Sequence, residues 1–106
     1  MTRAAMLACS GILGAVASVP SPALGADTAL GRHLAGECVT CHPRDNRPVG
    51  IPAIFGWPPD QFIAVLKSYK AKERANPVMQ SIAASLSEEE MAALAAYFAT
   101  LKPPAR

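Results

Sequence analysis

The chain has 106 residues and a formal net charge of +2 at pH 7, with 10 Lys and Arg against 8 Asp and Glu. A chain of this length forms one small domain. Its nearly balanced charge argues against nucleic-acid binding, which needs a strongly basic surface.

Residues 1–26 have the layout of a secretory signal peptide, with one positive charge near the start, then an uncharged and mostly apolar or small-residue stretch. We expect cleavage near residue 26, export of 27–106 to the periplasm as a single domain, and loss of Cys9 with the leader. The alternative is an uncleaved membrane anchor. Its Gly-, Ala- and Ser-rich apolar core is shorter than the roughly 20 residues that a stable span needs. Two cysteines then remain, too few for a disulfide framework.

The first predicted helix runs from about Thr28 to Glu37, with Asp27 or Thr28 as its N-cap. Gly31 weakens a helix intrinsically, so its presence suggests the close approach of another helix. This helix leads directly into the motif that follows.

Residues 38–42 read Cys-Val-Thr-Cys-His. A C-x-x-C-H run is the attachment signature of c-type haem. The thiols of Cys38 and Cys41 can add to the two vinyl groups of one porphyrin, and His42 then lies under the ring with a nitrogen aimed at the iron. The run occurs once in the chain, so we expect one covalent haem.

A bare C-x-x-C could instead be a redox-active dithiol or half of a zinc site. A thioredoxin-like dithiol is expected in a βαβ context, and the sequence shows no such pattern. A structural zinc site needs two further ligands, whereas the other candidates are Cys9 in the expected leader and His33 on the first predicted helix. The adjacent His42 and the export signal favour haem attachment.

Residues 43–58 form a loop by composition, because they contain four Pro and two Gly. The loop also carries large apolar side chains, at Ile51, Ile54, Phe55 and Trp57. They would be buried if the loop wraps over the edge and proximal face of a haem, or if it packs as ordinary core.

The second predicted helix starts at Pro59 or Asp60 and runs to about Ala71. Its apolar face follows helical spacing: Phe62, Val65, Leu66 and Tyr69. Positive residues cluster at its end: Lys67, Lys70, Lys72 and Arg74. They are either a solvated helix end or a docking surface for a partner.

Residues 75–85 are interpreted as an irregular connection. The last predicted helix begins at Ser87, which forms a capping box with Glu90. Leu86 and Met91 form the accompanying hydrophobic staple, and the prolines at 103 and 104 end the helix.

Met79 is the best candidate for the second axial position on the iron, because an irregular segment can be laid over the distal face of the haem. Met91 is explained by core packing, and His33 lies too close to the motif on a rigid helix. Ligation by both His42 and Met79 leaves no open site for a substrate. It favours one-electron transfer, and we expect no enzymatic activity. A haem sensor or enzyme that sheds Met79 is an alternative.

The chain resembles the class I cytochromes c from its first helix to Leu101. The resemblance is carried by residues 38–42, Ile51-Pro52, Tyr69-Lys70, 76–79 and 86–98, the last run being similar to the C-terminal helix of bacterial c4- and c553-type domains. It implies an all-α fold of three main helices and loops wrapped around one covalent haem.

The resemblance has further implications for single residues. It implies that the first and last helices cross at Gly31 and Tyr97. It also implies that the carbonyl of Pro52 accepts a hydrogen bond from His42, which fixes the tautomer of the imidazole.

Within this family the chain is similar to the haem subunit of flavocytochrome c sulfide dehydrogenase, mainly from Trp57 to Met79. This similarity implies a periplasmic carrier that accepts electrons from a sulfide-oxidising flavoprotein. A free soluble shuttle between respiratory or photosynthetic complexes is the alternative. Pro43 and Lys72 stand where relatives often have Gly, and these departures concern the details of partner docking.

Overall fold

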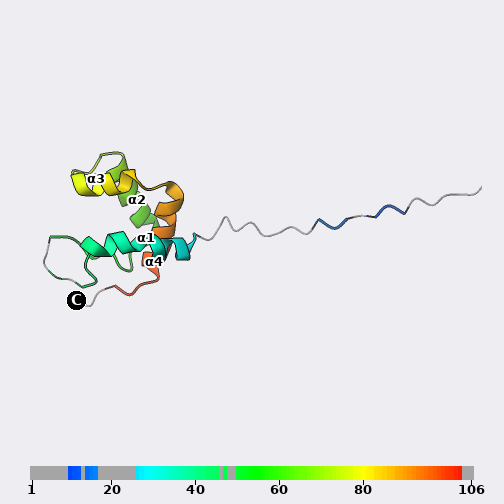
Figure 1. Cartoon of the computed structure of the whole chain (residues 1–106), viewed down its shortest axis with the longest axis horizontal. Coiled ribbons are helices and arrows are strands. Elements are labelled where there is room, and N and C mark those ends of the chain that lie inside the picture. Colours follow the sequence, from blue (N-terminus) through cyan, green and yellow to red (C-terminus); the bar gives the residue numbers. More distant parts are fainter. Residues whose placement is uncertain (1–9, 13, 17–25, 46, 48–49, 104–106) are drawn as a thin grey trace, which may run out of the picture.

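The computed structural model describes residues 10–12, 14–16, 26–45, 47 and 50–103 (Figure 1). Within these residues there are four helices and no strand: α1 (Thr28–Cys41), α2 (Pro59–Lys70), α3 (Pro77–Ala84) and α4 (Glu88–Ala99). The predicted all-α class is thus confirmed. Most of the expected signal peptide lies outside the described residues. In the described part, no helix has the length and apolar character that a membrane crossing requires.

Helix α1 is longer than the sequence predicted. Its N-cap is Asp27, whose carboxylate accepts hydrogen bonds from the backbone N–H groups of Ala29 and Leu30 at 3.0 and 3.1 Å. The helix continues past Glu37 to Cys41 and ends at His42, which has an extended backbone. The cause is Pro43, because a residue that precedes proline is driven out of the helical region. Cys38 and Cys41 therefore lie on the last turn of a helix.

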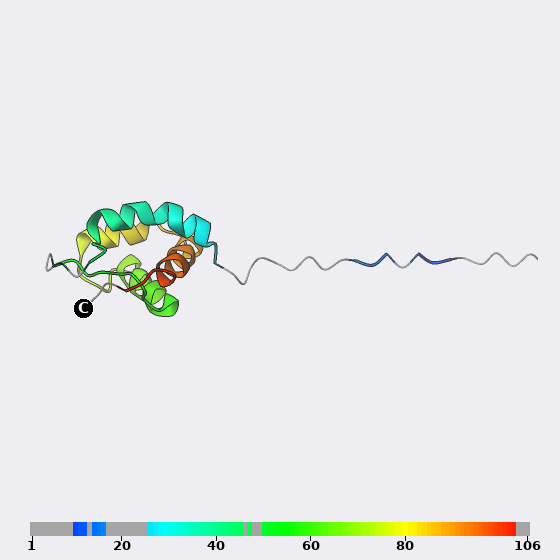
Figure 2. The same cartoon turned by 90° about the horizontal axis from the view of Figure 1, so that it is seen from below.

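Helices α1 and α4 pack closely (Figures 1 and 2). Their closest approach is at Gly31. A Cβ atom at this position would lie 2.0 Å from the carbonyl oxygen of Ala93 and 2.8 Å from the Cβ of Tyr97. Only glycine allows the two backbones to approach so closely. The predicted crossing of the first and last helices is confirmed.

The core is built around Phe98 of α4, which is fully buried. The ring of Phe62 from α2 stacks on it with centroids 5.4 Å apart, and that of Phe55 from the preceding loop lies 5.5 Å away. Met91 and Leu94 of α4 are also fully buried. The interpretation of Met91 as a core residue is therefore confirmed.

Helix α2 ends in a Schellman motif with an unusual residue at its left-handed position. The N–H of Glu73 donates to the carbonyl of Ser68 at 2.9 Å, and that of Lys72 donates to the carbonyl of Tyr69 at 3.0 Å. Lys72 has φ of +60°, where glycine is the usual residue. Lys72, which stands where relatives often have Gly, therefore adopts the left-handed conformation itself.

The segment predicted to be irregular, residues 75–85, contains helix α3. Asn76 is its N-cap and accepts a hydrogen bond from the N–H of Met79 at 3.1 Å, while Pro77 occupies the first helical position. The prediction of an irregular connection is wrong for residues 77–84, where Asn76 as N-cap and Pro77 at the first position start a short helix. Helix α3 packs against α2.

Helix α4 begins as the sequence predicted. The Ser87 hydroxyl accepts from the N–H of Glu90 at 3.1 Å, and the N–H of Ser87 donates to the Glu90 carboxylate at 2.9 Å. The capping box is confirmed.

Candidate functional site

The two thiols of the C-x-x-C-H run lie on one face of α1, because residues three apart on a helix are neighbours. Neither forms a disulfide. Cys38 is half-buried and packs against the core, whereas Cys41 is exposed. Burial raises the pKa of the Cys38 thiol above its usual value, and the negative charge of Glu37 adds to this effect. Cys38 therefore stays protonated at neutral pH when it carries no covalent partner.

The imidazole of His42 is held by the loop that follows it. Its Nδ1 atom lies 2.7 Å from the carbonyl oxygen of Pro52. A carbonyl can only accept, so Nδ1 must carry the proton and donate it. In the neutral ring this leaves the lone pair of Nε2 for a metal ion.

The loop from residue 43 to 58 is itself anchored on the core. The N–H of Gly56 donates to the carbonyl of Phe98 at 2.9 Å, and the indole N–H of Trp57 donates to the carbonyl of Ala53 at 3.2 Å. Ile54 is buried, and Phe55 and Trp57 pack against the core cluster. The interpretation of this part of the loop as ordinary core therefore accounts for Ile54, Phe55 and Trp57, of which Ile54 is buried and the other two are partly buried.

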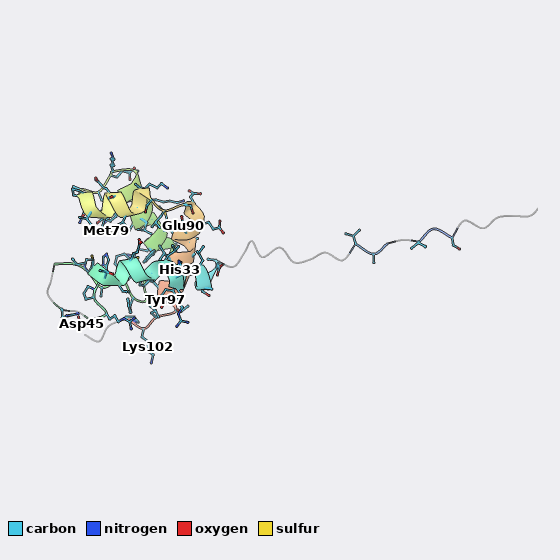
Figure 3. The ribbon with its side chains drawn as sticks, in the orientation of Figure 1. His33, Asp45, Met79, Glu90, Tyr97 and Lys102 are labelled. Atoms are coloured by element: carbon cyan, nitrogen blue, oxygen red, sulfur yellow. The ribbon has the colours of Figure 1, made fainter. Side chains whose placement is uncertain are left out.

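Met79 lies in the first half of α3, on the side that faces α1 (Figure 3). It is half-buried and packs against the core cluster. Both views place the N-terminal end of α3 at the same end of the molecule as the C-terminal end of α1, which His42 follows (Figures 1 and 2). No two Cα atoms of α1 and α3 lie within 8 Å of each other.

The donor set fits a covalently held haem. It combines two thiols on one helix face, an imidazole with a fixed tautomer and a thioether on a facing helix. Side chains of these types attach a porphyrin covalently and ligate its iron in c-type haem proteins. His33 is exposed on α1 and belongs to no metal cluster in the described part of the chain.

The positive cluster at the end of α2 is largely used within the domain. Lys67 pairs with Glu88 at 3.1 Å, and the ammonium group of Lys70 donates to the carbonyl of Leu86. Both contacts tie α2 to the start of α4. The guanidinium of Arg74 lies 5.8 Å from the ring centroid of Tyr69. Lys67 and Lys70 are therefore explained by their position at the end of α2, without a docking surface for a partner.

Two large apolar side chains beside the candidate site are exposed: Val78, which the sequence interpretation did not single out, and Ile51, which it expected to be buried. Val78, next to Met79, is 65% exposed, and Ile51, next to Pro52, is 40% exposed. In the described residues from 26 onward they are the large apolar side chains that are exposed. The signal that could have found them is their position beside the candidate site residues.

Residues 28–102 match the family described as cytochrome c. The chain belongs to the cytochrome c family. Its cofactor is therefore haem c, bound covalently, and the family to which it belongs consists of electron-transfer proteins.

Part of the chain is also similar to curated proteins. The chain is 37% identical over 70 residues to a thiosulfate dehydrogenase electron acceptor of Stutzerimonas stutzeri (strain A1501), a match that covers 63% of this chain and 32% of that protein. It is 33% identical over 72 residues to a protein of the same name from Thiomonas intermedia (strain K12), a match that covers 65% of this chain and 33% of that protein. It is 39% identical over 67 residues to a cytochrome c4 of Thiocapsa roseopersicina, a match that covers 61% of this chain and 34% of that protein. The chain matches about a third of the length of these relatives.

Proposed function

We propose that Cys38 and Cys41 hold the haem through thioether bonds, and that His42 and Met79 are its axial ligands. The observation that carries this proposal is the hydrogen bond from His42 Nδ1 to the Pro52 carbonyl at 2.7 Å, which leaves Nε2 for the iron. Met79 supports it because its backbone is fixed by Asn76 on the helix that faces α1.

The function that these residues support is that of an exported one-electron carrier. The haem, when bound, supplies a single iron that changes between its ferrous and ferric states. The residues of the chain attach it, fix the proton of His42 on Nδ1 and fill the remaining axial position with Met79. A thioether ligand favours the ferrous state and so raises the reduction potential.

The electron donor in this proposal is an enzyme that oxidises a reduced sulfur compound. The similarity to the haem subunit of flavocytochrome c sulfide dehydrogenase favours a sulfide-oxidising flavoprotein. The names of two relatives favour a thiosulfate dehydrogenase. Ile51 and Val78, which are exposed next to Pro52 and Met79 in the chain, are proposed to contact such a partner.

The donor is tested by mixing the oxidised holoprotein with each purified enzyme and its substrate, and by recording haem reduction in a stopped-flow instrument. We expect rapid reduction by one of the two. The double variant Ile51→Ser/Val78→Ser should be reduced about tenfold more slowly, because the apolar contact is lost. Ala99→Ser, on the exposed side of α4, should not change the rate.

Slow reduction by both enzymes, with rapid reduction by respiratory or photosynthetic complexes, would instead support the free shuttle. Dithionite should reduce wild type and variants equally, which checks that the haem itself is intact.

Export is proposed to depend on residues 1–26. Expression with the native N-terminus, followed by mass spectrometry of the periplasmic fraction, should give a haem-bearing chain that starts near residue 26 or 27. A full-length chain in the membrane fraction would support the retained anchor and contradict cleavage.

A further inference from the structure

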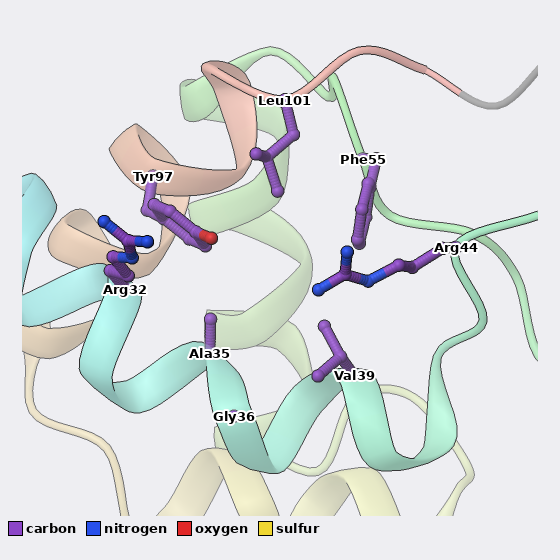
Figure 4. A pocket seen from close by; sticks show the side chains of 8 residues that line it. All are labelled: Arg32, Ala35, Gly36, Val39, Arg44, Phe55, Tyr97 and Leu101. Carbon is purple, nitrogen blue, oxygen red and sulfur yellow. The ribbon is translucent and has the colours of Figure 1, made fainter.

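A pocket of about 260 Å³ lies between α1, the C-terminal end of α4 and the loop after His42 (Figure 4). Its lining residues are Arg32, Ala35, Gly36, Val39, Arg44, Phe55, Tyr97 and Leu101. The α1 residues among them lie on a different flank of the helix from Cys38 and Cys41, neither of which lines the pocket. The pocket is therefore distinct from the proposed haem site. It is smaller than the pockets that hold drug-sized ligands.

The two charged side chains that line this pocket are both positive. Arg32 and Arg44 lie at opposite ends of it, beside Tyr97 and Phe55 respectively (Figure 4). No acidic side chain lines it, and neither arginine forms an ion pair with another described residue. Asp45, the neighbour of Arg44 in the chain, is paired with Arg47 at 2.7 Å.

The position of Arg44 is supported by an aromatic ring. Its guanidinium carbon lies 5.9 Å from the ring centroid of Phe55, a cation–π distance. Because Phe55 packs against the core, this contact holds a long side chain at the pocket. A guanidinium group presents several N–H donors that match the oxygens of a carboxylate or a sulfonate.

The remaining lining includes three apolar side chains, those of Ala35, Val39 and Leu101. The hydroxyl of Tyr97 points into the pocket (Figure 4) and makes no hydrogen bond to another described residue. A ligand that matches this lining has an anionic group at each end and an apolar middle.

We propose that the pocket bounded by Arg32 and Arg44 binds a short dianion with two separated anionic ends, of the dicarboxylate or polythionate type. Each end accepts hydrogen bonds from one guanidinium group, and the middle of the ligand lies over Ala35 and Val39. Haem attachment and electron transfer do not depend on this pocket, so the proposal can fail while the proposed function stands.

The test is isothermal titration calorimetry on the ferric holoprotein with glutarate, with tetrathionate and with acetate. The ferric state is used because it cannot reduce tetrathionate. The ionic strength is held constant with sodium chloride, since exposed charges are screened over about 10 Å at 0.1 M salt. We expect one saturable site for at least one dianion. Acetate, which can engage only one arginine, should bind at least about fivefold more weakly.

Variants locate the site. Arg32→Gln and Arg44→Gln should each weaken dianion binding at least about fivefold, because each removes a charge-assisted contact. Arg74→Gln is the matched control, since it removes the same charge and a similar aromatic contact, 5.8 Å from Tyr69, away from the pocket. The optical spectrum of the haem should be the same in all three, which checks the fold.

Several results would overturn the proposal. One is the absence of saturable binding for both dianions. Another is equal affinity for acetate and the dianions, which would show that the two ends are not engaged together. A third is an equal loss in Arg74→Gln, which would show that binding follows net charge. A preference for tetrathionate over glutarate, or the reverse, distinguishes the two sources of the ligand.

Discussion

The Nδ1 atom of His42 lies 2.7 Å from the carbonyl oxygen of Pro52, and this one contact links the haem-attachment motif to the loop that follows it. The loop is in turn joined to α4 through the hydrogen bond from Gly56 to Phe98. The orientation of the proposed proximal ligand therefore depends on the packing of the core.

A more flexible loop at Pro52 should weaken the hydrogen bond that orients the His42 imidazole. Pro52→Ala should destabilise the protein by about 0.4–1 kcal/mol, because it removes a restraint on the unfolded chain, and should let the Nδ1 proton exchange with solvent faster. NMR of the reduced holoprotein measures that exchange, with Pro58→Ala as the control at the start of α2. Unchanged exchange in Pro52→Ala would show that the hydrogen bond does not depend on the proline.

The helix crossing gives a prediction with an internal control. Gly31→Ala should cost about 1–3 kcal/mol or more, because its Cβ would lie 2.0 Å from the carbonyl oxygen of Ala93. Gly36→Ala, in the same helix, meets nothing within 4 Å and should stabilise the protein by up to about 1 kcal/mol. Denaturant unfolding of the two variants measures the difference. Equal stability of the two would contradict the crossing.

The left-handed residue at the end of α2 should limit stability. Lys72→Gly should raise the free energy of unfolding by roughly 0.5–1 kcal/mol, since φ of +60° is unfavourable for a residue with a Cβ. Lys72→Ala keeps the backbone cost and should change stability by no more than a few tenths of a kcal/mol. If both variants are equally stabilising, the cause is the charge of Lys72 and not its backbone.

The capping box of α4 should make stability depend on pH. The pKa of Glu90 is held below its usual value by the hydrogen bond from the backbone N–H of Ser87, then by the Ser87 hydroxyl, with a smaller contribution from the charge of Lys70. Because the pKa is lower in the folded state, this contribution to stability is fully present above the usual pKa. It is lost as the pH falls through the folded pKa.

Thermal unfolding of wild type and Glu90→Gln between neutral and acid pH checks this dependence. The wild type should be the more stable at neutral pH, and the difference should shrink as the solution becomes acid. Glu89→Gln, which lies outside the hydrogen-bonded box, is the matched control for removal of one negative charge from the same helix turn. A constant difference across the pH range would contradict the linkage.

Local signals in the sequence predicted much of this architecture. Ser87 and Glu90 mark the start of α4, the i, i+3, i+4 spacing marks α2, and Gly31 marks the helix crossing. The capping box and the apolar spacing are patterns of nearby residues, and the crossing at Gly31 was predicted from the family resemblance. Helix α3 was missed because it is short, and its stability comes from packing against α2 and from the Asn76 cap.

The sequence predicted which residues form the candidate site, but not the structure that positions them. The sequence supplies the identities of Cys38, Cys41, His42 and Met79, but not the helix that carries Met79. It also left open which apolar loop residues face solvent. Ile54, Phe55 and Trp57 pack inward, whereas Ile51 stays exposed, because the loop is tied to Phe98 by a backbone contact that no local pattern encodes.

The most direct test of the account is the optical spectrum of the ferric holoprotein and of Met79→Ala. Met91→Leu is the control, because Met91 is fully buried in α4 and serves the core. We predict that the absorption band of methionine ligation is present in wild type and in Met91→Leu and is lost in Met79→Ala, which should also bind carbon monoxide when reduced. Persistence of the band in Met79→Ala would contradict ligation of the iron by His42 and Met79.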